Sequence, residues 1–307
     1  MNILVLFSYG SLQSLDDVPG FYSDILGSHA TEEYIENGVK LYESHGMPDP
    51  LGIYTNRIGV GLIKLLREET GEDWIMCIAN HHVNPTIEEV AAKCGAIRPK
   101  RVLTTGLIPF DSLTGNISYR KKFEKLFRKD NRDAQLIHAG AFYKNKLFIK
   151  TMTRRAQEAL IWIPEVLRDE ATIIFTAHSM PGTTKAHEEF IRQYEFLAYQ
   201  IAKSLDIETY HIAYRSGSPP PERWLRPDVM DVLDQLRQQN VPSVIFIEAL
   251  SIIENLEAIQ EITHHALNKA RRLQMKAVQT DYLNDSFDFV EAMANHLFKE
   301  LKIPKYL

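Results

Sequence analysis

The sequence predicts an α/β fold of two similar lobes, each a four-stranded parallel sheet flanked by helices, with a cleft between the lobes. Short apolar runs rich in β-branched residues alternate with longer amphipathic segments, an order typical of parallel sheets that helices cover on both faces. The eight apolar runs divide four and four along the chain. Since no Gly/Ser linker or low-complexity segment separates the two groups, we expect the lobes to pack directly on each other.

The individual elements follow from the periodicity of the apolar residues. Strands are expected near 2–8, 73–79, 101–107 and 134–139 in the first lobe, and near 171–177, 207–214, 243–250 and 275–280 in the second. Helices are expected at 31–45, 54–70, 86–97, 115–129, 183–204, 227–239 and 252–272. A further helical segment at 144–163 contains the predicted boundary between an N-terminal lobe, 1–150, and a C-terminal lobe, 151–307.

Composition limits the possible functions. The 307 residues are 45% apolar and 24% charged, with a net charge of −5 and no long basic run, so nucleic acid is not an expected partner. Cys77 and Cys94 form neither a metal-type pair nor a disulfide framework, which favours a reduced, cytoplasmic setting. The chain starts directly with a strand, and no apolar run approaches the ~18 residues of a membrane span, so no targeting or transmembrane segment is expected.

The apolar run that begins at Ala171 ends abruptly in His178-Ser179. Ligands bind beyond the carboxyl ends of strands in open α/β sheets, and histidine is the usual proton acceptor near neutral pH. We therefore expect His178 at the cleft, the alternative being a loop histidine with a satisfied hydrogen bond. His82 follows another strand in the same way, and because adjacent side chains point in opposite directions, at most one of His81 and His82 should face the cleft.

The two lobes show signs of a distant repeat. The segment Leu6–Ser11 ends the first strand of one lobe, and Ile174–Ser179 ends the first strand of the other. If pseudo-symmetry relates the lobes, Tyr9 and His178 face each other across the cleft.

Two segments after strands of the second lobe carry charged side chains. Ser251 and Glu254 have the spacing of a capping box, which predicts the start of helix 252–272. At 100° per residue, one side of this helix carries acidic and histidine side chains, and it is either a solvated face or a line of metal ligands. These side chains are Glu254, Glu257, Glu261 and His265. The loop 214–228 carries Arg215 and Trp224, and it is either a rigid structural loop or part of the cleft.

Taken together, these motifs resemble those of the ferrochelatase family over nearly the whole chain. The strongest motif is Phe175–Pro181, which resembles the family's Phe-Ser-Ala-His-Ser-Leu-Pro. The other similar segments, in the family's order, are Phe7–Ser11, Asp49–Leu51, Trp224–Asp228, Ser251–Ile259 and Leu283–Asp285.

The resemblance implies a chelatase-like fold and the insertion of a divalent metal, expected to be Fe(II), into coproporphyrin III or protoporphyrin IX for haem biosynthesis. It implies His178 as proton acceptor or metal donor, with Glu254 as its carboxylate partner. Together with the residues singled out above, the expected metal ligands are His178, Glu254, Glu257 and Glu261, and the expected porphyrin-binding residues are Tyr9, Tyr119, His82, Trp224 and Arg215. No cofactor and no iron–sulfur cluster are expected, since Fe(II) is a substrate.

The chain departs from the family's pattern around the glutamate. Ser251-Ile252 stands where the family has Asp-His, and Ala258 and Ile262 stand where it has acidic residues. Residues 25–28 replace the basic residues of the Gram-positive branch. Two other functions therefore stay open: a non-catalytic protein that binds haem or porphyrin, and a chelatase for another metal or tetrapyrrole.

Overall fold

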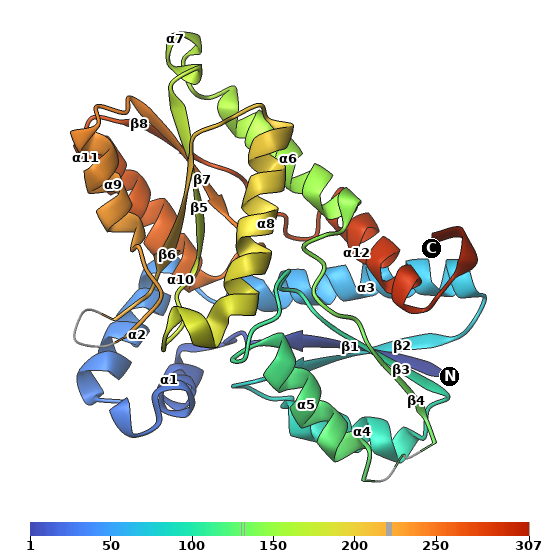
Figure 1. Ribbon diagram of the computed structural model, residues 1–307. Helices are drawn as coiled ribbons and strands as arrows, with labels where there is room; N and C mark the ends of the chain where they lie inside the picture. The colour runs from blue at the N-terminus through green and yellow to red at the C-terminus, as the bar shows by residue number, and fades with distance from the viewer. Residues whose placement is uncertain (130, 132, 219–222, 307) are drawn as a thin grey trace.

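Two four-stranded parallel sheets form the framework of the computed structural model, which describes residues 1–129, 131, 133–218 and 223–306 (Figure 1). This confirms the predicted fold class. The strands are β1 (Asn2–Ser8), β2 (Trp74–Asn80), β3 (Arg101–Gly106), β4 (Gln135–His138), β5 (Ala171–His178), β6 (Tyr210–Arg215), β7 (Ser243–Glu248) and β8 (Lys276–Gln279).

The two sheets share one topology. Their strand orders are β2-β1-β3-β4 and β6-β5-β7-β8, so the first strand of each lobe lies between the second and the third. Both central strands are almost wholly buried, which explains why they are continuous apolar runs rather than alternating ones. The equal order supports the predicted likeness of the lobes, and it places the carboxyl ends of β5, β6 and β7 side by side.

Helices cover both faces of each sheet. In the N-terminal lobe α3 lies on one face and α4 and α5 on the other, whereas α6 and α8 face α9 and α11 across the second sheet (Figure 1). The longer helices are α1 (Val18–Leu26), α2 (Glu32–His45), α3 (Pro50–Thr70), α4 (Ile87–Ile97), α5 (Asn116–Phe127), α6 (Lys146–Leu160), α8 (Glu188–Ser204), α9 (Val229–Gln238) and α12 (Phe287–Glu300). The short ones are η1 (Leu15–Asp17), η2 (Gly27–His29), α7 (Glu165–Arg168), η3 (Thr184–His187), α10 (Leu256–Ala258), η4 (Ile259–Ala266), α11 (Leu267–Arg272) and η5 (Pro304–Tyr306). Among the longer helices, α1 and α12 had not been predicted from the sequence.

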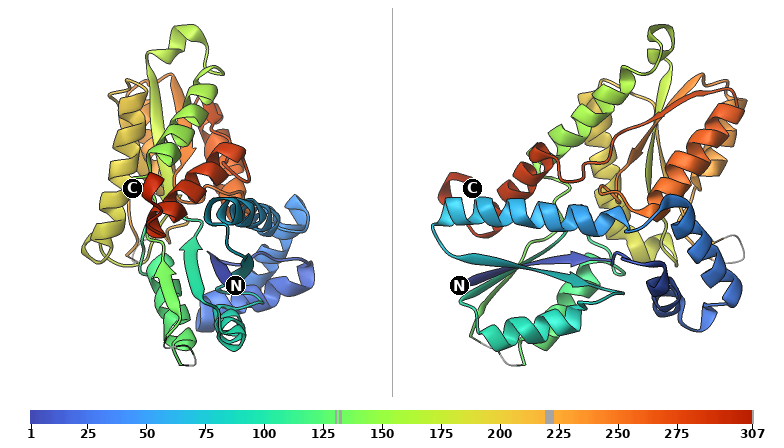
Figure 2. Two further views of the ribbon diagram at one scale, coloured as in Figure 1. Left: turned by 90° about the vertical axis from the view of Figure 1, so that its right-hand side faces the viewer. Right: turned by 180° about the vertical axis from the view of Figure 1, so that it is seen from behind.

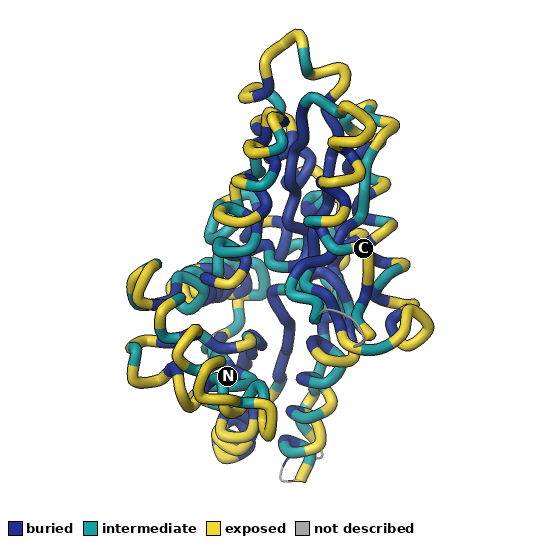
Figure 3. The backbone as a smooth tube through the Cα atoms, turned by 90° about the vertical axis from the view of Figure 1, so that its left-hand side faces the viewer, coloured by how far each residue is buried: buried dark blue, intermediate teal, exposed yellow. Residues whose placement is uncertain are grey.

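The lobes pack directly on each other, as the missing linker predicts. The last helix, α12, returns to the N-terminal lobe and packs against both α3 and α6 (Figure 2). One continuous core therefore contains residues of both halves, and buried stretches of the chain are seen in both lobes (Figure 3). On the side of α2, Leu256 packs into a cluster with Phe21 and Tyr42 of the N-terminal lobe. The predicted boundary at residue 150 lies within α6, and it stays a prediction.

The segment 252–272 differs from the uniform helix that we predicted. Its first turn starts at Leu256, and Asn255 is the N-cap residue, accepting a hydrogen bond from the Ala258 N–H at 2.9 Å. The predicted capping box is therefore wrong, because Glu254 precedes the helix. After α10 the chain continues as the π-helix η4, and only then as α11. Among the described helices, none is long and apolar enough to cross a membrane.

Candidate active site at the ends of three strands

His178 is the last residue of β5, and its backbone lies opposite Arg215, the last residue of β6. Its Nδ1 lies 2.5 Å from the carbonyl oxygen of Ser179, an acceptor, so Nδ1 carries the proton. Its Nε2 lies 3.5 Å from Oε1 of Glu257. The backbone contact thus fixes the ring and leaves Nε2 as the nitrogen that can accept or release a proton.

Glu257 and His178 shift each other's pKa. Burial alone would lower the pKa of His178, but the Glu257 carboxylate outweighs burial and holds that pKa above its ordinary value. Burial would likewise raise the pKa of Glu257, whereas His178 and Arg215 together lower it to about 2. Glu257 is therefore ionised near neutral pH, and its side chain is still 52% exposed at the cleft.

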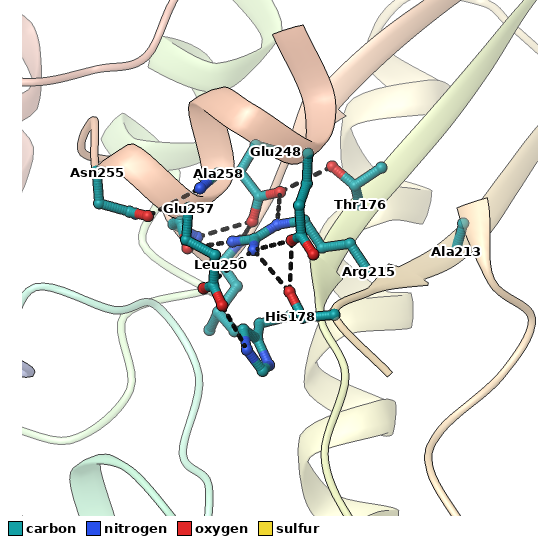
Figure 4. A network of polar contacts seen from close by, with 12 residues as sticks. Thr176, His178, Ala213, Arg215, Glu248, Leu250, Asn255, Glu257 and Ala258 are labelled. Carbon is teal, nitrogen blue, oxygen red and sulfur yellow. Dashed lines mark hydrogen bonds and ion pairs between the residues drawn. The ribbon is translucent and has the colours of Figure 1, made fainter. Parts of the chain in front are cut away.

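The carboxylate that lies beside His178 is that of Glu257, whereas we predicted Glu254 as the partner. Glu254 lies in the turn before α10, where its backbone N–H donates a 3.0 Å hydrogen bond to Oδ1 of Asn284. The delayed helix start places Glu257, one turn further along, beside His178 (Figure 4). A catalytic role of Glu254 stays a prediction.

Arg215 lies at the centre of a polar network beneath this pair (Figure 4). Its side chain is 1% exposed, and its Nε donates to Oε2 of Glu248 at 3.1 Å. Its Nη1 lies 2.8 Å from Oε2 of Glu261 and 3.4 Å from Oε2 of Glu257, and its Nη2 donates to Oγ of Ser251 at 2.7 Å. The burial of Arg215 leaves its predicted contact with a porphyrin without support, because the surrounding side chains cover the charge.

Glu248 is the buried anchor of the network, with a side chain that is 2% exposed. Besides Arg215 it accepts hydrogen bonds from the Thr176 hydroxyl at 2.9 Å and from the Ser251 backbone N–H at 2.9 Å. We did not single out Glu248 from the sequence, although a lone acidic residue at the end of the apolar run 243–248 was a signal. Ser216, whose hydroxyl donates to Oε2 of Glu261, was also missed.

The N-terminal lobe contributes aromatic and imidazole side chains. The rings of Tyr9 and His82 lie 4.5 Å apart, and Nδ1 of His82 lies 2.6 Å from Oδ2 of Asp24. Burial and the charge of Glu257 both raise the pKa of Tyr9. A position of Tyr9 opposite His178 across the cleft stays a prediction.

Two details of this lobe differ from the predictions. The rings of His81 and His82 lie 4.2 Å apart, rather than pointing to opposite sides, because β2 ends at Asn80 and the chain turns there. Tyr119 is only 5% exposed and packs edge-on against Phe7. Its contact with a porphyrin stays a prediction.

Trp224 lies beside the loop that follows His178. Its backbone pairs with Pro181 in an isolated bridge, and Ser179 Oγ donates to the carbonyl oxygen of Leu225 at 2.9 Å. These contacts join the loop after β6 to the loop after β5. They are compatible with both interpretations of 214–228, a rigid structural loop and a part of the cleft. Residues 219–222 of that loop lie outside the described residues.

The predicted metal ligands are only partly brought together. Glu257 and Glu261 converge, but on Arg215, and Glu254 stands apart from them. Within the described part of the chain, no group of three or more His, Cys, Asp or Glu side chains is arranged as a metal site.

Comparison with known proteins decides the family, because the ferrochelatase family model matches residues 4–301. The chain belongs to the ferrochelatase family. This confirms the resemblance drawn from the motifs and with it the enzyme class, a metal–porphyrin lyase of haem biosynthesis.

The relatives are distant but cover most of the chain. The ferrochelatase of Herpetosiphon aurantiacus is 25% identical over 292 residues, covering 94% of this chain and 96% of that protein. Coproporphyrin III ferrochelatase 2 of Bacillus cereus is 24% identical over 303 residues, covering 97% and 94%. The coproporphyrin III ferrochelatase of Staphylococcus epidermidis is 27% identical over 266 residues, covering 84% and 85%.

A solved structure shares the fold. SirB from Bacillus subtilis with Fe³⁺ superposes with a TM-score of 0.61 at 9% identity, covering 97% of this chain and 95% of that one. At this identity the similarity concerns the fold alone.

Proposed function

We propose that this chain inserts Fe(II) into coproporphyrin III, with His178 accepting the two pyrrole protons one after the other at Nε2 and releasing each to solvent. The observation that carries the proposal is the pairing of His178 Nε2 with the Glu257 carboxylate at the carboxyl end of β5. The choice of coproporphyrin III is supported by the Bacillus cereus and Staphylococcus epidermidis relatives, whose names carry that substrate.

The chemistry requires a base and a place for the ring. Two pyrrole protons leave the porphyrin as the metal enters, and a neutral imidazole accepts such protons near neutral pH. Glu257 stabilises the imidazolium that forms, because it stays ionised with a pKa of about 2. Tyr9 and His82, whose rings lie 4.5 Å apart in the N-terminal lobe, are the aromatic and imidazole side chains that we propose for contact with the ring. Imidazole also suits Fe(II) as a ligand, so His178 can pass the metal on as well.

The experiment is anaerobic incubation of the protein with Fe(II) and, separately, coproporphyrin III or protoporphyrin IX, followed by absorbance spectroscopy. We expect the spectrum of the iron porphyrin to appear, and to appear faster with coproporphyrin III. Parallel incubations with Zn(II) and Co(II) test the preference for iron. Faster insertion into protoporphyrin IX would overturn the substrate assignment.

A second candidate function is a non-catalytic protein that carries haem or porphyrin. The observation in its favour is that Glu257 and Glu261, two of the predicted metal ligands, are already held by a guanidinium. Absence of insertion with every metal and porphyrin, together with tight binding of haem, would favour this function.

A cytoplasmic location is a further proposal, supported by the free thiols of Cys77 and Cys94. Independence from a cofactor stays a prediction.

A further inference from the structure

The most unusual group at the site is the buried cation. Arg215 is 1% exposed, and each of its three nitrogens has a partner in the network. Arginine is not deprotonated in proteins, so its charge is permanent. A permanent positive charge therefore lies beside the two acidic side chains that a divalent ion would have to approach.

The carboxylate oxygens of Glu257 and Glu261 that point into the site lie next to Arg215 or His178. Oε2 of Glu261 lies 2.8 Å from Nη1 of Arg215, and Oε2 of Glu257 lies 3.4 Å from the same nitrogen. Oε1 of Glu257 faces His178 at 3.5 Å. A divalent ion can bind these carboxylates only by displacing the guanidinium or by accepting its repulsion at close range.

We propose that Arg215 is an internal cation that competes with the divalent substrate metal for Glu257 and Glu261, and that it thereby sets the metal affinity of the site. Arg215 is a positioning residue: its hydrogen bond holds Glu257 where the other oxygen reaches His178. The consequence is weak capture of metal at these carboxylates, combined with a well-oriented base. The inference rests on the proposed function in taking the metal as a substrate.

Because Arg215 and Glu248 form a buried ion pair, both charges can be removed together in one variant. Arg215→Gln alone would leave Glu248 buried and unpaired, and the variant would risk unfolding. Arg215→Gln/Glu248→Gln removes both charges and keeps side chains of related shape. Arg215→Lys keeps the charge and serves as the matched control. A third variant adds Glu257→Gln and Glu261→Gln to the neutral pair.

Zn(II) binding is measured on the full chain without porphyrin, by competition with a chromophoric chelator. We expect the neutral pair to bind Zn(II) at least tenfold more tightly than the native protein. The gain should disappear when Glu257 and Glu261 are also replaced, and Arg215→Lys should stay within about threefold of the native affinity. An unchanged affinity in the neutral pair, verified as folded by circular dichroism, would overturn the proposal. An equal gain in Arg215→Lys would overturn it too, because the charge would then not be the cause.

The insertion reaction gives an independent readout. In the neutral pair we expect the KM for metal to fall at least tenfold and kcat to fall as well, because Glu257 loses the contact that orients it. An unchanged KM for metal would contradict the proposal. If the native protein inserts no metal at all, the proposed function fails, yet the Zn(II) measurement still tests the role of Arg215.

Discussion

Replacing Glu248 by Gln should destabilise the protein strongly, although the side chain lies beneath the reacting groups. The carboxylate is 2% exposed and accepts four hydrogen bonds, two at each oxygen, from Arg215, Thr176, Leu250 and Ser251. An amide has one acceptor oxygen, so its NH₂ group would face two of these donors. Breaking a buried ion pair costs about 3–5 kcal/mol. Because Arg215 retains its ion pairs with Glu257 and Glu261 in the variant, we expect the free energy of unfolding to fall by about 3 kcal/mol, the lower end of that range.

The assay is thermal and urea unfolding of the native protein and the variant at neutral pH. A loss of this size lowers the Tm of a chain of this length by roughly 5–10 °C. Glu254→Gln is the control, since in the described part of the chain its carboxylate has no hydrogen-bond or ion-pair partner. It should stay within about 0.5 kcal/mol of the native protein. A loss of less than about 1 kcal/mol in the free energy of unfolding of Glu248→Gln would refute the reasoning, because exposed ion pairs contribute that little.

Three further predictions concern the reacting pair. His178→Ala should lower the rate of metal insertion by about 10²-fold or more while porphyrin binding, followed by absorbance, stays near native; wild-type turnover would remove the base assignment. Glu257→Gln should lower kcat more than Glu254→Gln does, and the opposite order in steady-state rates would restore Glu254 as the partner. The pKa of His178 is raised, so its contribution to stability is present below its ordinary 6.5 and is lost as pH rises through the raised value. The pKa of Glu257 is lowered to about 2, so its contribution is present above its ordinary 4.5 and is lost as pH falls. The difference in Tm between native protein and Glu257→Gln should therefore be largest between pH 4.5 and 6.5, and a difference that keeps growing above pH 8 would contradict the pairing.

The fold could be predicted because its signals are local. Each buried strand is a continuous apolar run, and alternation with amphipathic segments permits few arrangements other than parallel sheets. His178 was found for the same reason, since it ends such a run. The choice of glutamate could not be predicted, because it depends on where a helix starts. The Asn255 cap delays the start to Leu256, and the π-helix that follows departs from 100° per residue.

The buried pair of Arg215 and Glu248 lay beyond local reasoning for a different reason. The two residues are 33 positions apart and end strands on opposite sides of β5. Only the strand order brings them together, and the sequence predicted the strands without their order. With that order assumed, an arginine and a glutamate at the ends of the two strands that flank β5 would have suggested an ion pair.

Arg215 also acts on the base itself, and its two effects belong together. Glu257 raises the pKa of His178, which on its own would favour an imidazole that is already protonated and cannot accept a pyrrole proton. Burial and the charge of Arg215 act in the other direction and lower that pKa. The guanidinium thus limits the proton affinity of the imidazole while it orients the carboxylate that stabilises the imidazolium. This is the same charge that we propose to oppose a divalent ion at Glu257 and Glu261, so one guanidinium acts on both the base and the carboxylates.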